Sequence, residues 1–158
     1  MAELLTRRYR HLQLGVHANP PIAPEVASAI YARFAGELRG FLGLLGAAVR
    51  AWAPLHPGQP MTANDIIATA GPVARQELIE KIGENDTERL QEITDGWPFD
   101  AEFRVADIQR RCSITQAGAS KLAARLADAG VIAPTRRQGK SQYYVLSGGP
   151  ISIALGIQ

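Results

Sequence analysis

Residues 105–132 read VADIQRRCSITQAGASKLAARLADAGVI, and this stretch decides the fold of the second half of the chain. Apolar residues return at helical spacing in two blocks, which predicts one helix over residues 106–111 and another over residues 116–129. The segment between them, residues 113–115 (SIT), predicts a tight turn in which Thr115 is the N-cap of the second helix. Two helices joined in this way indicate a helix-turn-helix.

The predicted second helix has an apolar face and a polar face. Residues at positions i, i+3, i+4 and i+7 form a buried stripe: Ala119, Leu122, Ala123 and Leu126. The opposite side presents small and polar residues at the N-terminal end of the helix, continued by an arginine: Gln116, Ala117, Ser120, Lys121 and Arg125. A recognition helix uses such positions to contact base edges and phosphates in the major groove.

A basic hairpin is predicted after Gly130. Residues 131–133 and 142–146 read as two strands, and residues 136–140 (RRQGK) join them, with Gly139 as the permissive turn residue. Three basic side chains lie at its tip: Arg136, Arg137 and Lys140. An exposed basic hairpin suits flanking phosphates or the minor groove. Residues 103–105 are a candidate third strand.

Charge is divided unevenly along the chain, whose overall net charge is +2. Residues 103–147 hold eight basic and two acidic side chains, a net charge of +6, whereas residues 1–102 hold nine basic and thirteen acidic. Clustered Lys and Arg favour a polyanionic partner on one face, although a solvated basic surface has the same composition. Arg110 and Arg111, at the end of the first helix, are further candidates for phosphate contact.

Together, the segment SITQAGASKLAARLADAGVI, the hairpin RRQGK and the strand YYVL resemble the winged helix-turn-helix superfamily, in the style of MarR-like and ArsR-like regulators and of the winged modules appended to Fic-type proteins. The resemblance covers residues 103–147 and implies a DNA-binding module. Two positions depart from it: Ser113 stands where glycine is frequent, and Gln109 where alanine is common. The first hundred residues resemble no family.

The N-terminal part is predicted to be helical after an arm that ends near Pro24. Apolar residues at steps of three or four predict one long helix over residues 25–52, along which lie Gly36, Gly40, Gly43 and Gly46. These glycines favour close approach of another helix, either internal or from a second copy, and we expect a homodimer. Shorter helices are predicted over residues 62–70, over residues 72–82, and from Asp86 or Thr87 to near residue 95.

Several classes of protein are disfavoured. No apolar run reaches the length of a membrane span, no secretory signal is present, and the one cysteine excludes an internal disulfide, so we expect a cytoplasmic bacterial protein. No phosphate loop, nucleophile elbow or carboxylate and histidine grouping is present, so no enzyme and no cofactor are expected. His11, His17 and His56 lack metal-ligand spacing. Cys112 is read as a small buried residue, with a redox sensor as the alternative.

The sequence therefore predicts a mainly α-helical protein with two parts. Residues 1–99 form a helical module for dimerisation or partner docking, and residues 100–158 form a winged helix-turn-helix with an apolar tail. The predicted function is a sequence-specific regulator of transcription that binds double-stranded DNA. The alternative is a winged-helix protein-interaction subunit of a larger nucleic-acid-processing complex of a plasmid, phage or defence system. The acidic helices of the N-terminal module are a possible site for a protein partner.

Overall fold

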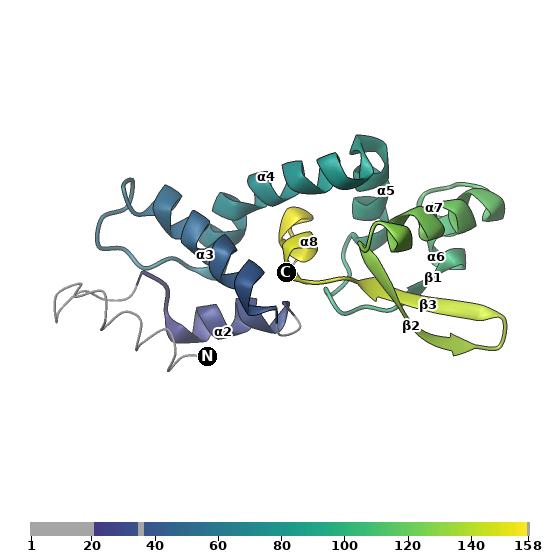
Figure 1. Ribbon diagram of the computed structural model, residues 1–158, viewed down its shortest axis with the longest axis horizontal. Coiled ribbons are helices and arrows are strands. Elements are labelled where there is room, and N and C mark those ends of the chain that lie inside the picture. Colours follow the sequence, from purple (N-terminus) through teal and green to yellow (C-terminus); the bar gives the residue numbers. More distant parts are fainter. Residues whose placement is uncertain (1–20, 35–36, 158) are drawn as a thin grey trace.

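The computed structural model describes residues 21–34 and 37–157. The described part is mainly helical with one small antiparallel sheet, which confirms the predicted fold class. In chain order the elements are α2 (Pro24–Ala32), α3 (Leu38–Trp52), α4 (Ala63–Ile82), α5 (Glu84–Thr94), β1 (Phe103–Arg104), α6 (Val105–Arg111), α7 (Gln116–Asp128), β2 (Ile132–Gln138), β3 (Ser141–Leu146) and α8 (Gly149–Ala154). Figure 1 shows an elongated molecule, with α2 and α3 toward one end, the sheet at the other and α4 running across the middle.

The single long helix predicted over residues 25–52 is wrong, because the chain forms α2 and α3 with a turn between them. The Phe34 amide donates to the Tyr31 carbonyl at 2.9 Å, which ends the helical run. The Glu37 side chain then caps α3 by accepting from the amide of Gly40 at 2.9 Å. Gly36 lies outside the described residues.

Aromatic packing explains why two helices replace one. Tyr31 and Phe34 of the first segment both meet Phe41 of α3 edge to face, with ring centroids 5.0 and 5.6 Å apart. In one straight helix Phe34 and Phe41 would be separated by about 10 Å along the axis, too far for their rings to pack on each other. Folding α2 back onto α3 buries Phe34 and Phe41 to 1% and 0% exposure, which removes their apolar surface from water.

The predicted stop at Gly71-Pro72 is also wrong, because α4 runs unbroken from Ala63 to Ile82 with Pro72 inside it. A proline in a helix interior costs about 3 kcal/mol. The buried residues of α4 continue at four-residue steps on both sides of the proline: Ile66, Ala70, Ala74 and Leu78. Burial of this continuous stripe offsets the cost of Pro72. Thr62 is the N-cap as predicted, in a reciprocal capping box with Asp65.

The C-terminal residues return to the helices that begin the chain. Helix α8 packs along α4 and also contacts α2 and α3 (Figure 1), and the tail buries Ile151, Ile153, Leu155 and Ile157. Gly149 packs so closely on Phe34 that a Cβ added there would lie 2.6 Å from the Cγ of the ring. The division at residue 99 remains a prediction. Helix α8 follows that division in the sequence but packs on helices that precede it.

A winged helix is formed by α6, α7 and the three-stranded sheet, whose strand order is β1-β3-β2. The predicted third strand is confirmed, since Phe103 pairs with Tyr144 and Arg104 with Tyr143. Helix α5 packs against α6, which in turn packs against α7, β1 and β3. Helix α5 packs against α4 as well, so it contacts both predicted parts of the chain.

None of the helices in the part of the chain that the structure describes combines the length and the apolar character needed to cross a membrane.

Candidate nucleic-acid interface

The turn between α6 and α7 is built around Ser113, whose φ of 51° lies in the left-handed region. Glycine reaches this region without strain, whereas a serine is strained there. This explains why glycine is the residue expected at position 113. The Ile114 amide donates to the Gln109 carbonyl at 3.2 Å and closes the turn. Thr115 caps α7, since its hydroxyl accepts from the Gly118 amide at 3.1 Å. These contacts fix where α7 begins and the direction in which it leaves the turn.

The predicted buried stripe of α7 is confirmed, because Ala119, Leu122, Ala123 and Leu126 are all at most 1% exposed. This stripe fixes which side of α7 faces outward. The side chains predicted to contact bases are exposed and make no hydrogen bond to any other side chain within the described ranges: Gln116, Ala117, Ser120 and Lys121. The N-terminal half of α7 is therefore open to a partner. Contact with DNA at these residues remains a prediction.

Arg125, predicted to continue this surface, is engaged inside the protein. Its guanidinium makes two hydrogen bonds to the Asp86 carboxylate of α5, from Nε and from Nη2, each 2.8 Å long. The Asp86 side chain is 11% exposed and that of Arg125 is 54% exposed. This fork ties the middle of α7 to α5 and raises the pKa of Arg125 through the Asp86 hydrogen bond. Asp86 is thus a structural partner of α7 that no local sequence pattern indicated.

The two arginines at the end of α6 also have partners. Arg111 donates to the backbone carbonyl of Asp95 at 2.7 Å, at the end of α5, and its guanidinium lies 4.1 Å from the Trp97 ring centroid. Arg110 pairs with Asp107 at 2.6 Å but keeps 72% of its side chain exposed. Arg111 thus connects α6 to α5, whereas Arg110 remains accessible to a phosphate.

The hairpin is longer than predicted. Strand β2 continues to Gln138, so the turn at the tip holds only Gly139 and Lys140, and Arg136 and Arg137 lie in the strand. Arg137 and Lys140 are exposed and form no ion pair with another described residue. Gly139 adopts a φ of 60°, as a turn residue of this kind requires.

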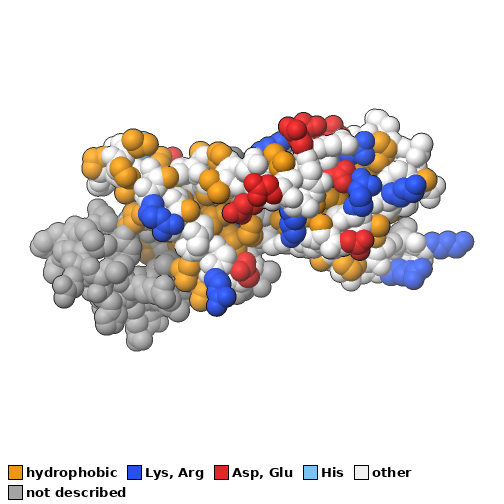
Figure 2. All heavy atoms as spheres, turned by 45° about the horizontal axis from the view of Figure 1, so that its top comes forward, with side chains coloured by type: hydrophobic (Ala, Val, Ile, Leu, Met, Phe, Trp, Pro, Cys, Tyr) orange, Lys and Arg blue, Asp and Glu red, His pale blue; other side chains and the backbone are white. Residues whose placement is uncertain are grey.

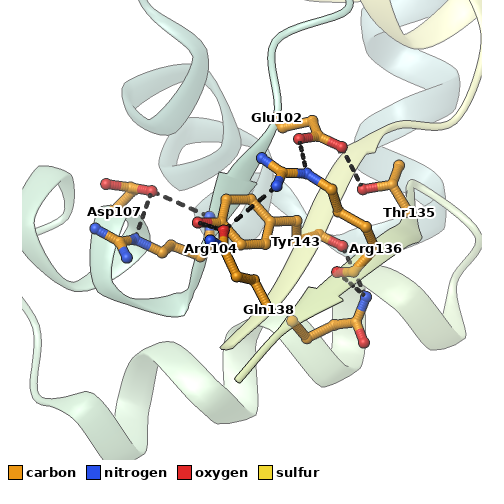
Figure 3. A network of polar contacts seen from close by, with 8 residues as sticks. Glu102, Arg104, Asp107, Thr135, Arg136, Gln138 and Tyr143 are labelled. Carbon is orange, nitrogen blue, oxygen red and sulfur yellow. Dashed lines mark hydrogen bonds and ion pairs between the residues drawn. The ribbon is translucent and has the colours of Figure 1, made fainter. Parts of the chain in front are cut away.

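Arg136 is held in a polar network across the sheet (Figure 3). Its Nε donates to the Glu102 carboxylate at 2.6 Å, and its guanidinium lies 4.2 Å from the Tyr143 ring centroid. Thr135 donates to the same carboxylate at 2.8 Å. The sequence places Glu102 before the hairpin and gives no sign of this contact, which spans 34 positions.

The charge of the winged helix changes once α5 is included. Residues 84–147 carry nine basic and nine acidic side chains, so the net charge of +6 counted over residues 103–147 is cancelled by α5 and the segment after it. Several of these charges pair with one another, since Asp86, Glu102 and Asp107 each form an ion pair with an arginine of the same stretch. In Figure 2 blue side chains are most numerous at the end of the molecule that carries α6, α7 and the hairpin, with a few red side chains among them. A local basic surface therefore exists without a basic domain.

Cys112 is packed between α6 and α5, where its Sγ lies 3.6 Å from the Arg89 carbonyl oxygen. Burial raises the pKa of the thiol to about 11, and nearby Glu92 adds to the shift. A redox sensor needs an accessible thiolate, so the geometry favours a packing role.

Within residues 21–34 and 37–157 no group of three or more His, Cys, Asp or Glu side chains is placed to hold a metal. His11 and His17 lie outside the described residues.

Comparison with known proteins gives little beyond the geometry. No family model matches the chain, and no curated protein matches it. Among solved structures, the chain is similar to reduced HlyU from Vibrio cholerae N16961, with 16% sequence identity and a TM-score of 0.42 over 54% of this chain and 84% of that chain. A likeness of this size supports no conclusion about function.

Proposed function

We propose that this protein binds double-stranded DNA through α7 and the β2–β3 hairpin and regulates transcription. The observation that supports it most strongly is the open N-terminal half of α7. Gln116, Ser120 and Lys121 are exposed there, while the buried stripe on the other side of the helix keeps the orientation fixed. A rigid helix with free amide, hydroxyl and ammonium groups at its N-terminal end is suited to contacting base edges in the major groove.

The hairpin supplies the second contact. Arg137 and Lys140 project from the end of a two-stranded ribbon, and neither pairs with a carboxylate of the described residues. We assign them to phosphates that flank the major-groove site, where they add affinity for every sequence. Arg110 lies on the outer surface of α6 and is assigned to a further phosphate. Arg111 and Arg125 are assigned to holding α5, α6 and α7 together, because both use their donors internally.

We further propose a homodimer in which α3 contributes to the interface. A Cβ added at Gly43 would meet nothing within 4 Å, and one at Gly46 would meet only Arg50 of the same helix. The glycines expected to admit a second helix thus have no such helix beside them within the described residues. Two copies related by a twofold axis would present two α7 helices to half-sites about 34 Å apart, which favours a near-palindromic sequence.

A second candidate function is supported by the charge balance of the winged helix. With nine basic and nine acidic residues over 84–147, this unit is not basic as a whole, unlike most nucleic-acid-binding modules. A winged helix that docks another protein of a nucleic-acid-processing complex would have this composition. Such a subunit binds duplex DNA weakly in isolation and is not required to dimerise.

One experiment separates the two functions. The purified protein is incubated with random-sequence duplex DNA at low salt, bound duplexes are selected and sequenced, and the mass of the complex is measured by sedimentation. Enrichment of a palindromic motif with two chains per duplex supports the regulator. Gln116→Ala and Ser120→Ala should then change the motif, whereas Arg137→Ala should lower yield without changing it. An unenriched pool and a monomer would reject the regulator in favour of the second candidate.

A further inference from the structure

A carboxylate from the segment before β1 lies against the hairpin, close to the side chains proposed to contact phosphates. Glu102 precedes β1 and accepts a hydrogen bond from Arg136 Nε at 2.6 Å and one from Thr135 Oγ1 at 2.8 Å. On its other side, the Arg136 guanidinium is stacked 4.2 Å from the centroid of the Tyr143 ring. Figure 3 shows the guanidinium between Glu102 and Tyr143. Arg136 therefore has a defined position although 55% of its side chain is exposed.

The backbone of β2 builds this contact. Between Pro134 and Arg137 the pairing of β2 with β3 shifts register, so β2 holds one extra residue there. In a regular strand neighbouring side chains point to opposite faces, so Thr135 and Arg136 would not reach the same group. A bulge redirects one of the two side chains. Both then bond Glu102, which shows that strand geometry, and not only side-chain flexibility, brings the three residues together.

The contact persists over the ordinary pH range. The hydrogen bond from Arg136, and then that from Thr135, lowers the pKa of Glu102 below its usual range. The same pair raises the pKa of Arg136. Both groups are thus charged at neutral pH, and the carboxylate neutralises Arg136 while adding a negative charge close to where a phosphate would approach.

We propose that Glu102 withholds Arg136 from DNA, so that the hairpin contacts phosphates through Arg137 and Lys140. This inference rests on the proposed DNA-binding function and identifies an internal competitor within the same surface. Glu102 holds the Nε edge of Arg136, so a phosphate that approaches the remaining guanidinium donors meets a charge that the adjacent carboxylate already neutralises. Glu102 thereby lowers both the affinity for duplex DNA and the number of ionic contacts made.

The test uses Glu102→Gln in the full-length protein, because glutamine preserves shape and an acceptor for Thr135 but removes the charge. We expect this variant to bind duplex DNA up to about fivefold more tightly, the gain available from one exposed ion pair. The slope of log K against log salt should steepen by about 0.9, as one more phosphate is neutralised. Glu77→Gln, an exposed glutamate on α4, changes net charge equally and should leave both quantities unchanged.

Arg136 provides the second arm of the experiment. Arg136→Ala in the otherwise unchanged protein should weaken binding less than Arg137→Ala does, whereas the same change in the Glu102→Gln protein should abolish the gain. The proposal is overturned if Glu102→Gln binds as the unmodified protein does or more weakly. It is also overturned if Arg136→Ala alone weakens binding as much as Arg137→Ala does.

Failure of DNA binding and failure of the proposed role of Glu102 give different results. If the unmodified protein binds no duplex DNA at low salt, the proposed function is wrong and the role of Glu102 is rejected with it. If binding is present and depends on Arg137 but is indifferent to Glu102, only the role of Glu102 is rejected. Circular dichroism and a thermal unfolding curve of each variant verify that the fold is retained in every arm.

Discussion

Replacement of Gly149 by alanine is expected to destabilise the whole protein, although α8 is short and close to the C-terminal end of the described chain. The added Cβ would lie 2.6 Å from the Cγ of Phe34 and closer still to two other carbons of that ring. Ordinary contacts of this kind are 3.4 to 4 Å long, so the ring or α8 must move by roughly 1 Å. Phe34 is 1% exposed and packs on Phe41, which leaves the ring little room.

The expected loss follows from the cost of overpacking a dense core. Extra methyl groups forced into well-packed interiors typically cost about 1–3 kcal/mol, and the severity of this overlap places Gly149→Ala at about 2–3 kcal/mol. In a chain of this size each kcal/mol lowers Tm by about 2–4 °C, so a fall of roughly 5–10 °C is expected.

Urea unfolding followed by circular dichroism gives the free energy of unfolding for the unmodified protein, Gly149→Ala and three comparison variants. Phe34→Leu removes part of the ring and should make Gly149→Ala less costly in the double variant than in isolation, because the two residues are in contact. Gly71→Ala is the matched control, since a Cβ there would meet only the Ile153 carbonyl oxygen, at an ordinary 3.4 Å, and should stabilise α4 by up to about 1 kcal/mol. A Gly149→Ala protein as stable as the unmodified one would refute the packing of α8 against the N-terminal helices.

Three further results are expected. Asp86→Asn, which weakens the fork with Arg125, should cost about 1 kcal/mol of stability in urea unfolding, and a loss that did not shrink at high salt would contradict an ionic cause. Burial raises the pKa of Cys112 to about 11, so iodoacetamide at pH 8 should label the native protein at least about tenfold more slowly than the urea-unfolded protein. Equal labelling rates would show that the thiolate is accessible in the native protein. The Thr62 hydroxyl lowers the pKa of Asp65, so the stability that this carboxylate provides is complete at neutral pH and is lost as pH falls below about 5. Asp65→Asn should therefore lose less stability than the unmodified protein between pH 6 and pH 3. Parallel curves of stability against pH would argue against the capping box.

The helix-turn-helix was predictable because its signals are local. The apolar spacing of residues 119–126, the cap at Thr115 and the turn at Gly139 each depend on neighbours within a few positions, and the structure has all three. The errors in the N-terminal half have the opposite origin. Whether the apolar stripe of residues 25–52 forms one helix or two depends on which aromatic rings meet, and Pro72 is tolerated only because α4 is buried along its length.

The candidate site was only partly predictable for the same reason. Exposure of Gln116, Ser120 and Lys121 follows from the helical period alone. The carboxylates that pair with Arg125 and Arg136 lie 39 and 34 positions away in the sequence. No local sequence pattern predicts either ion pair. The charge count over residues 103–147 also leaves out the acidic helix α5, which packs against α6 and pairs with Arg125 of α7.

The salt dependence of duplex binding tests the proposed function most directly. The association constant is measured by fluorescence anisotropy from about 50 to 200 mM salt for the unmodified protein and for an Arg137→Ala, Lys140→Ala double variant of equal stability. If these residues neutralise two phosphates, the slope of log K against log salt should become shallower by about 1.8 in the variant. Identical slopes, or no binding by either protein at the lowest salt, would contradict DNA recognition by this surface.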